Sequence, residues 1–338
     1  MGINCYRFEL KPYKRTLKGL TNARGDIPQQ GGRWLRLQRD GDGRVGFGEM
    51  VSLQGFGVES LEEVDQFCYS LKGCIKEDEI FSIPPNLSVT RSGFESAWRN
   101  LDSISARPHR YFSVVALLPN GEKGLKTIIN KKKEGFLFFK WKIGINKFSE
   151  EKAIFSQLYK HLSQNGKIRL DANGSLDEKL GHQWLSFLEN YPLVDFLEQP
   201  LKPDKLHLMQ KWTEEFSTPL ALDESIASSD SLKDLDWNGV YVIKPSLLGE
   251  WNSFIPWARE RKKEIVFSTA FESAVGVDNI LKLAEDVDLV RPIGFGVSDY
   301  LPATDRKYHG VKPYIKQYLE YNQIDSFFAK KENSLGCI

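Results

Sequence analysis

The sequence has few cysteines and no long apolar run. Its 338 residues include four cysteines, Cys5, Cys68, Cys74 and Cys337. They form neither a CxxC pair nor a zinc-ligand spacing, and they are too sparse for a scaffold built on disulfides. No stretch approaches the roughly 20 apolar residues that cross a bilayer, and the start lacks the apolar segment of a secretory signal. We therefore expect reduced thiols in a cytoplasmic protein.

An excess of either charge is also absent. Lysine and arginine number 46 against 45 aspartates and glutamates, which gives a formal net charge of +1. This balance gives no electrostatic reason to expect nucleic acid or an anionic membrane as a partner. A small-molecule partner is the better expectation, and the sequence leaves monomer and homo-oligomer open. None of the five histidines ends an apolar strand, so we assign them no catalytic role.

The N-terminal third has the pattern of antiparallel strands followed by helices. Residues 5–12 and 33–51 alternate apolar and polar side chains, with a Gly-Asp-Gly turn inside the second stretch. Ser60 and Glu63 then form a capping-box pattern ahead of apolar residues at helical spacing. These features predict a separate α+β domain, in keeping with a chain longer than one usual core.

Farther along, short apolar strands alternate with amphipathic helices. Six apolar runs end on charged or polar residues, which are Lys140 with Lys142, Asp171, Glu198, Asp223, Lys244 and Ser268. The spacing fits the roughly 31 residues per unit of a (β/α)₈ barrel, whose strands share one mouth at their carboxyl ends. We predict an α/β protein with an α+β capping domain over residues 1–105 and a (β/α) barrel over 106–305. A C-terminal segment over 306–338 is expected to pack back on the capping domain.

Three local patterns refine this organisation. Ser175 and Glu178 form a second capping-box pattern, placed just after a predicted strand as a βα unit requires. Apolar residues beyond residue 310 suggest a last helix. Gly294 and Gly296 lie in the predicted eighth strand, where we expect them to let a substrate approach closely.

The three carboxylates Asp171, Glu198 and Asp223 end consecutive predicted strands. Acidic groups that point together repel strongly unless a cation lies between them. Oxygen ligands select a hard divalent ion, and a site that leaves room for water and substrate favours Mg²⁺, with Mn²⁺ as a possible substitute. Taken one at a time, such residues are more often helix caps or solvated loop positions. The three together predict a metal site.

Two lysines next to the predicted metal site are candidates for an acid–base role. Lys140 and Lys142 are separated by one residue in a strand, so both point to one face while Trp141 points to the other. Two neighbouring ammonium groups beside a dication lower each other's proton affinity, which makes Lys142 a candidate general base. Lys244 is expected across the mouth, unless it is a structural lysine paired with a carboxylate. Such a site can remove the proton α to a carboxylate and stabilise the enediolate.

Five motifs in order resemble the enolase superfamily, in its branch with lysines on the second and sixth strands. They are Lys140-Trp141-Lys142, Asp171-Ala172-Asn173-Gly174, Glu198-Gln199-Pro200, Asp223-Glu224-Ser225 and Lys244-Pro245. The stretches 267–276 and 116–121 look most like the o-succinylbenzoate synthase family. Trp141 is bulkier than is usual there, and we expect it to alter packing and leave the chemistry unchanged.

The resemblance implies a barrel of the modified TIM type and a carbon–oxygen lyase. The implied reaction is Mg²⁺-dependent syn-dehydration of 2-succinyl-6-hydroxy-2,4-cyclohexadiene-1-carboxylate to 2-succinylbenzoate, for menaquinone or phylloquinone. Lys142 would take the α-proton and return it to the departing hydroxide, while Lys244 would stabilise the intermediate from the opposite face. Lys140, Asn173 and Ser268 would bind or position the substrate.

Two other functions remain open. The same opposed lysines would serve an N-acylamino acid racemase or dipeptide epimerase of this superfamily. A barrel kept only as a binding scaffold would have no chemical reason to keep the carboxylates and lysines. A lid over the mouth is expected at residues 20–26, where Arg24 is a candidate partner for a substrate carboxylate.

Overall fold

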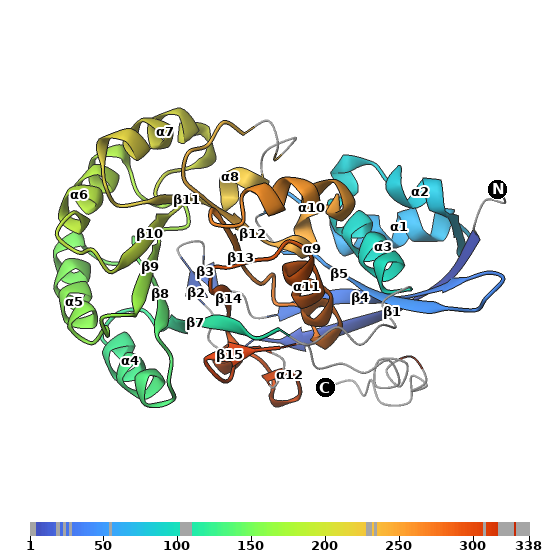
Figure 1. Cartoon of the computed structure of the whole chain (residues 1–338), viewed down its shortest axis with the longest axis horizontal. Coiled ribbons are helices and arrows are strands. Elements are labelled where there is room, and N and C mark those ends of the chain that lie inside the picture. The colour runs from blue at the N-terminus through green and yellow to red at the C-terminus, as the bar shows by residue number, and fades with distance from the viewer. Residues whose placement is uncertain are drawn as a thin grey trace.

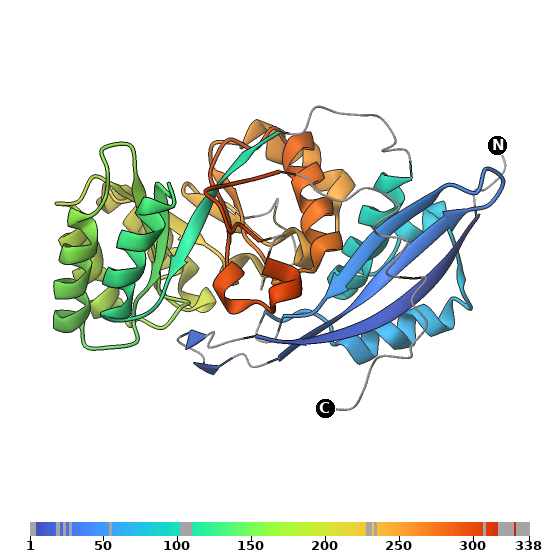
Figure 2. The same cartoon turned by 90° about the horizontal axis from the view of Figure 1, so that it is seen from below.

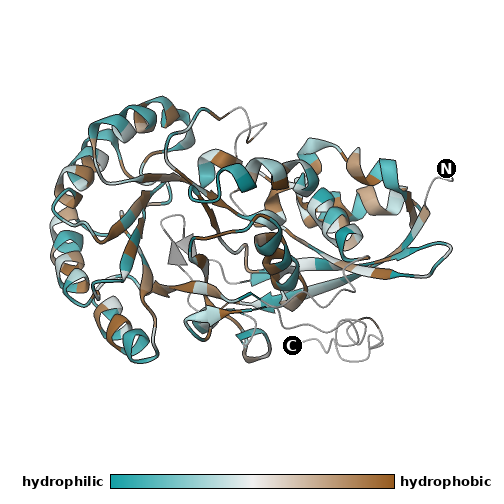
Figure 3. Ribbon diagram, in the orientation of Figure 1, coloured by the Kyte–Doolittle hydropathy of each residue, from teal (hydrophilic) through white to brown (hydrophobic). Residues whose placement is uncertain are grey.

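The chain folds into a barrel and a sheet-and-helix domain that lie side by side (Figure 1). The computed structural model describes residues 5–17, 21–22, 25–26, 29–53, 56–101, 110–227, 232, 235–306, 309–316 and 328. Apolar residues follow the barrel strands and the inward sides of the outer helices, as Figure 3 shows. The two parts therefore have separate cores, one around the barrel strands and one beneath the antiparallel sheet.

The capping domain is a four-stranded antiparallel sheet covered by helices (Figure 2). Its strands, in the order β5-β4-β1-β6, are β5 (Val45–Val51), β4 (Gln29–Arg39), β1 (Cys5–Thr16) and β6 (Cys74–Lys76). Its helices are α1 (Leu61–Ser70), α2 (Glu77–Phe81), the 3₁₀ turn η1 (Pro85–Leu87) and α3 (Ser88–Asn100). The antiparallel strands and the capping box of Ser60 and Glu63 are as predicted.

Helix α3 packs closely on β5 because β5 contains two glycines. A Cβ atom at Gly46 would lie 1.9 Å from the backbone oxygen of Ala97, and one at Gly48 would lie 2.1 Å from that of Gly93. Any larger residue would force the helix away from the strand. The glycines therefore set the depth at which the capping domain packs.

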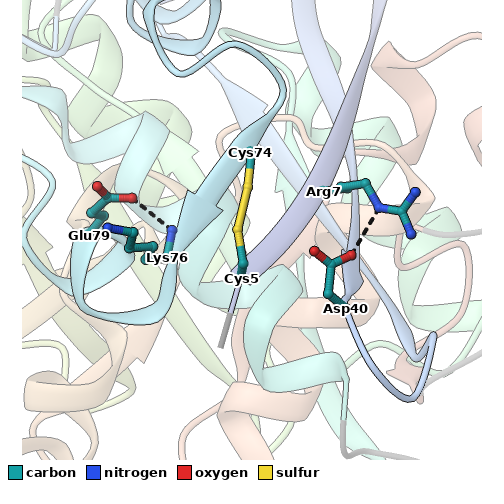
Figure 4. Close-up of a disulfide and its surroundings, with 6 residues drawn as sticks. All are labelled: Cys5, Arg7, Asp40, Cys74, Lys76 and Glu79. Carbon is teal, nitrogen blue, oxygen red and sulfur yellow. Dashed lines mark hydrogen bonds and ion pairs between the residues drawn. A yellow bond between two sulfur atoms is a disulfide. The ribbon is translucent and has the colours of Figure 1, made fainter. Parts of the chain in front are cut away.

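Cys5 and Cys74 form a disulfide, so the prediction of reduced thiols is wrong for this pair. The two residues are 69 positions apart in the sequence, and their Cα atoms are 6.8 Å apart. Antiparallel pairing of β1 with β6, with Tyr6 opposite Ile75, makes them diagonal neighbours (Figure 4). Spacing alone could not show this pairing. Cys68 is a free buried cysteine, and Cys337 lies outside the described residues.

Eight parallel strands form the barrel. They are β7 (Phe112–Leu118), β8 (Phe138–Lys142), β9 (Lys167–Asp171), β10 (Val194–Glu198), β11 (Leu220–Leu222), β12 (Val240–Ile243), β13 (Ile265–Phe267) and β14 (Ile293–Gly296). Each pairs with the next from β7 to β13, and β14 pairs with β7. A parallel bridge between Ser268 and Gly294 joins the remaining edges. The predicted barrel is therefore confirmed.

Helices follow the strands around the outside of the barrel, with α4 to α7 forming its outer arc (Figure 1). They are α4 (Lys123–Lys133), α5 (Phe148–Lys160), α6 (Glu178–Leu188), η2 (Pro203–Lys205), α7 (Leu206–Glu215), α8 (Glu224–Ala227), α9 (Pro245–Leu248), α10 (Trp251–Glu260), α11 (Ala274–Asp286), η4 (Ser298–Tyr300) and α12 (Ala303–Arg306). The capping box predicted from Ser175 is wrong. Asp177 caps α6 instead, accepting from the amide of Leu180 at 2.7 Å, because the helix begins only at Glu178.

The first residues of the predicted last helix are extended instead, while Tyr318 and Leu319 lie outside the described residues. Tyr314 and Ile315 form β15, which pairs antiparallel with β7 of the barrel, because extended pairing buries Ile315 there. The ring of Phe328 lies 5.6 Å from that of Phe47 in the capping domain. The domain limits at residues 105 and 306 stay a prediction.

The two glycines of β14 allow close packing between strands, and their expected role in substrate approach stays a prediction. A Cβ atom at Gly296 would lie 2.1 Å from the backbone oxygen of Val115, and one at Gly294 would lie 2.9 Å from Oγ of Ser268. They allow β14 to approach its neighbours where the barrel closes. Among the described residues, no helix is both long enough and apolar enough to cross a membrane.

Candidate active site

The registers of the barrel strands bring the predicted site residues to one end of the barrel. Lys142 pairs with Asp171 across β8 and β9, and Asp171 pairs with Glu198 across β9 and β10. Asp223, Lys244 and Ser268 directly follow the next three strands. Carboxyl ends of parallel strands share one mouth. Residues up to 126 positions apart therefore become neighbours there.

Most side chains directly below this mouth are apolar, and the guanidinium of Arg169 lies among them, 4.8 Å from the ring centre of Phe196. Phe196, Ala221, Val240, Val242 and Val266 form a separate buried cluster. Side chains alternate along a strand, so Phe196 points to the same side as Glu198, and Val242 to the same side as Lys244. The polar groups of the mouth therefore lie above a buried layer that is largely apolar but also contains Arg169.

Asp171, Glu198 and Asp223 are all buried, with at most 5% of each residue exposed. Nζ of Lys140 lies 2.9 Å from Oδ2 of Asp171 and 2.7 Å from Oε1 of Glu198, so one ammonium bridges two carboxylates. Lys140 thus carries the positive charge that faces these two carboxylates, and its expected contact with substrate stays a prediction.

Burial and neighbouring charge separate the acidities of this cluster. Burial first, and then the nearby negative charges of Asp171 and Asp223, raise the pKa of Glu198 to about 8. Burial alone would also raise the pKa of Asp171, but the ammonium groups of Lys140 and Lys142 lower it to about 2. Burial thus disfavours the charged form of Glu198, a cost that a cation bound beside it would offset.

The side chains are not arranged as a ready-made metal site. Across the part of the chain that the structure describes, no three His, Cys, Asp or Glu side chains converge closely enough to hold a metal ion. The ammonium of Lys140 occupies the space between two of the carboxylates, and that of Lys244 pairs with Asp223. These ammonium groups stand where a cation would lie. The donor set of three buried carboxylates suits a hard divalent ion.

Lys142 has a neutral side chain as its nearest partner and a carboxylate farther away. Its Nζ donates to Oδ1 of Asn173 at 2.7 Å and lies 3.7 Å from Oδ2 of Asp171. Burial lowers the pKa of Lys142, and the positive charge of Lys140 lowers it further, against the opposing effect of Asp171. Lys142 is therefore more easily deprotonated than Lys140, whose pKa is raised by the carboxylates around it.

Asn173 holds this arrangement in place. Its backbone φ is +47°, a left-handed conformation that asparagine tolerates better than most residues. Its side-chain amide donates to Asp171 at 3.3 Å and to Glu224 at 3.2 Å, while its oxygen accepts from Lys142. Asn173 thus connects Lys142 to the acidic cluster.

Lys244 lies at the inner end of a cavity between the barrel and the capping domain. It forms an ion pair with Asp223, and its Nζ lies 4.2 Å from the ring centre of Phe56. This ion pair is the one expected if Lys244 were a structural lysine paired with a carboxylate. The cavity has a volume of about 740 Å³ and is also lined by Arg91 and Trp257, so Lys244 also borders a space large enough for a small ligand.

Gln199 is a positioning residue to which sequence reasoning gave no role. Its side-chain oxygen accepts from the amides of Asp223 at 3.0 Å and Ser225 at 3.1 Å. Its side-chain nitrogen donates to Oγ of Ser225 at 2.7 Å. Gln199 therefore fixes the direction in which Asp223 leaves β11. The Glu198-Gln199-Pro200 motif was the available signal.

Ser268 is half-buried at the mouth, and its amide donates to the oxygen of Ile243 at 2.8 Å. The expected lid is only partly described. Residues 21–22 and 25–26 pair as the short strands β2 (Thr21–Asn22) and β3 (Gly25–Asp26), which lie over the barrel end in Figure 1. Arg24 lies outside the described residues.

Comparison with known proteins places this geometry in a family. The family model "Enolase C-terminal domain-like" matches residues 127–247. The o-succinylbenzoate synthase of Thermosynechococcus vestitus is 32% identical over 305 residues, which cover 88% of this chain and 94% of the relative. A second relative of the same description, from Aliivibrio salmonicida, is 25% identical over 76% of this chain and 83% of its own length.

Solved structures agree with this relationship. The o-succinylbenzoate synthase of Thermosynechococcus elongatus BP-1, complexed with Mg in the active site, superposes with a TM-score of 0.84 at 30% identity. The match covers 96% of this chain and 99% of that one. The L-Ala-D/L-Glu epimerase of Bacillus subtilis gives a TM-score of 0.71 at 18% identity, covering 90% and 92% of the two chains. The likeness to the epimerase shows a shared fold.

Proposed function

The chain belongs to the o-succinylbenzoate synthase family of the enolase superfamily, and from this premise we propose how its residues carry out the family reaction. The reaction converts 2-succinyl-6-hydroxy-2,4-cyclohexadiene-1-carboxylate to 2-succinylbenzoate and water, a step toward menaquinone or phylloquinone. Lys142 is the general base and acid, and Lys244 is the opposing cation. Asp171, Glu198 and Asp223 hold the metal.

The observation that carries the proposal is the unequal environment of the lysines. Lys140 bridges two carboxylates at 2.9 and 2.7 Å, whereas Lys142 donates to a neutral amide at 2.7 Å. An amine beside a neutral acceptor loses its proton more easily than one between two anions. Of the two lysines on this strand, Lys142 is therefore suited to act as the base.

Proton transfer then follows one face of the ring. The amine of Lys142 takes the proton α to the carboxylate, and the C–H electron pair passes into the enediolate. The new ammonium then gives this proton to the hydroxyl group as its C–O bond breaks, so water leaves and the ring becomes aromatic. Lys244 stays charged, and its position beside Phe56 and Asp223 suits it to stabilise the negative charge from the other face.

The donor set fits Mg²⁺. Three buried carboxylates offer only oxygen ligands. Burial and the charges of Asp171 and Asp223 raise the pKa of Glu198 to about 8 even beside Lys140. When bound, Mg²⁺ supplies positive charge to the substrate carboxylate and the enediolate. Lys140, displaced from between the carboxylates, would be free to contact the substrate carboxylate. Mn²⁺ is proposed to substitute because it also prefers oxygen ligands.

Asn173 and Ser268 complete the proposed substrate site. Asn173 keeps Lys142 in position through its 2.7 Å hydrogen bond. Ser268 is half-buried at the end of β13, in the register that points Lys244 and Glu198 into the mouth. Its hydroxyl is proposed to face the ligand from this side.

A direct assay separates this function from epimerisation, which the same two lysines could perform. The purified protein is incubated with Mg²⁺ and either the cyclohexadiene carboxylate or L-Ala-L-Glu. We expect aromatic product from the first and little or no epimer from the second. Efficient epimerisation without dehydration would overturn the assignment.

Location and assembly follow the same reasoning. A small-molecule carboxylate is the proposed ligand, and neither nucleic acid nor membrane is proposed as a partner. A cytoplasmic location stays a proposal, and the Cys5–Cys74 disulfide weighs against it because disulfides are rare in reducing compartments. Cell fractionation would test the location.

A further inference from the structure

The loop that follows β13 is held by the capping domain. It runs from Ser268 to Ser273 and leads into helix α11. The side chain of Gln30, on β4, donates a hydrogen bond to the backbone oxygen of Ala270. The carboxylate of Glu49, on β5, accepts from the amide of Ser273 at 2.8 Å. Two strands of one domain thus contact the middle and the end of a loop from the other.

Glu49 is almost fully enclosed, with 3% of the residue exposed. Besides the Ser273 amide, it accepts from Oγ of Ser273 at 2.5 Å, from the amide of Gly276 at 2.7 Å and from the hydroxyl of Tyr13. A buried carboxylate is tolerated only when it is hydrogen-bonded in this way. Its negative charge also lies at the N-terminus of α11, where the helix dipole favours an anion.

Helix α11 is shaped to receive this carboxylate. A Cβ atom at Gly276 would lie 2.7 Å from Oε2 of Glu49, so only glycine lets the carboxylate reach the first turn. Trp34, directly opposite Glu49 in the sheet, donates to Oγ of Ser273 at 2.8 Å. The contact is therefore a built interface between domains.

The loop itself has one closely specified conformation. Phe271 has a backbone φ of +61°, which costs energy in a residue of this size. Inside the loop, the carboxylate of Glu272 accepts from Oγ1 of Thr269 at 2.5 Å and from the amide of Ala270 at 3.0 Å. From the C-terminal segment, Nε2 of His309 bonds to the backbone oxygen of Glu272 at 2.6 Å. Contacts from outside the barrel help to hold this conformation.

We propose that Glu49 and Gln30 are positioning residues for the reaction, acting through the loop to fix Ser268 and the adjoining side of the mouth. The inference rests on the proposed function. It adds that the contacts of the capping domain with this loop set the geometry of the barrel mouth. Neither residue touches the substrate. Loss of either one loosens the loop and weakens productive binding while the fold persists.

The test uses Glu49→Gln with Glu189→Gln as the matched control. Glu189 has a similar donor set, the amides of Ser217 and Thr218 at 3.0 Å and Oγ of Ser217 at 2.9 Å. It follows α6, and its partners precede β11 at the opposite end of the barrel. Hydrogen–deuterium exchange of the peptide covering residues 268–277 and steady-state kinetics are measured at a temperature where thermal unfolding shows each variant folded.

Glu49→Gln is expected to increase amide exchange in this peptide at least about tenfold, and to lower kcat/KM at least about tenfold through a raised KM. Glu189→Gln should change neither quantity. Unchanged exchange in Glu49→Gln would overturn the proposal. Faster exchange with unchanged kcat/KM would also overturn it, because Glu49 would then be purely structural.

Gln30→Met provides a second and milder variant, which keeps the length of the side chain but removes the donor to Ala270. Gln38→Met, on the same strand at an exposed hairpin, is its control. Gln30→Met is expected to increase amide exchange in residues 268–277 and to lower kcat/KM, each by less than Glu49→Gln does, while Gln38→Met should change neither. If the wild type does not dehydrate the cyclohexadiene carboxylate, the proposed function fails, whereas the exchange measurement still decides whether Glu49 and Gln30 hold the loop.

Discussion

Nζ of Lys142 donates to Oδ1 of Asn173 at 2.7 Å, while the nearest carboxylate oxygen of Asp171 is 3.7 Å away. A neutral acceptor is thus the closest partner of the proposed base. This choice of partner keeps the amine from being stabilised as an ammonium, which a carboxylate at the same distance would do.

Replacing this neutral partner by an acid tests the relationship. Asn173→Asp adds a negative charge beside Lys142 and raises its pKa, so the acid limb of the pH dependence of kcat/KM is expected to move to higher pH. Activity at neutral pH falls accordingly. Asn165→Asp, at an exposed position before β9, is the control and should leave the limb in place. An unmoved limb in Asn173→Asp would argue that Lys142 is not the base.

Removing either opposed lysine should abolish most of the rate. Lys142→Ala and Lys244→Ala are each expected to lower kcat by roughly three orders of magnitude, the scale of a lost general base or a lost stabilising charge. Circular dichroism should show both variants folded. Lys167→Ala, at the exposed start of β9, should keep wild-type kinetics. Near-normal turnover in either active-site variant would contradict its assignment.

The metal assignment predicts a binding defect. Asp223→Asn replaces a charged oxygen ligand by a neutral one, so titration calorimetry should show the Kd for Mg²⁺ raised about tenfold or more. Asp177→Asn is a suitable control, because asparagine caps a helix as well as aspartate does and Asp177 caps α6 away from the cluster. Equal Mg²⁺ affinity in the two variants would remove Asp223 from the ligand set.

Acid should destabilise the fold through His309. Burial, with a smaller contribution from the charge of Arg15, lowers the pKa of His309 from 6.5 to about 3. Between pH 6.5 and 3, His309 is therefore protonated in the unfolded chain and neutral in the folded chain. The stability that neutral His309 contributes is fully present above pH 6.5 and is lost as the pH falls toward 3. At one pH unit below 6.5 the loss is ~1.4 kcal/mol.

Urea unfolding at pH 7.5 and 5.5 measures this loss. The wild type should lose more free energy of unfolding than His309→Gln between these two values. His182→Gln, which replaces a half-exposed histidine on α6, should lose as much as the wild type. If His309→Gln lost as much free energy of unfolding between these pH values as the wild type, groups other than His309 would cause the acid sensitivity.

Strand periodicity explains why the site could be predicted so far. Lys140 and Lys142 share a face because side chains alternate along β8, and Asp171 and Glu198 become neighbours because parallel strands align their ends. These rules depend on local pattern and fold class alone. They could not show that Lys140 would bridge Asp171 and Glu198, because this depends on whether an ammonium group or a metal ion lies between the two carboxylates.

Contacts between distant segments were beyond the reach of the sequence. The Cys5–Cys74 disulfide exists because β1 and β6 pair across 69 positions, and Tyr314 belongs to a strand because β7 offers it an edge. Glu49 received no role because its partners, at Ser273 and Gly276, lie more than 220 positions away. Tertiary pairing decided each of these features, and local propensity did not.

The most direct test of the central claim is a crystal structure of the protein with Mg²⁺ and 2-succinylbenzoate. The account predicts one Mg²⁺ bound by Asp171, Glu198 and Asp223, with the carboxylate of the product beside it. Nζ of Lys142 and Nζ of Lys244 should then lie on opposite faces of the ring. A metal bound elsewhere, or both lysines on one face of the product, would contradict it.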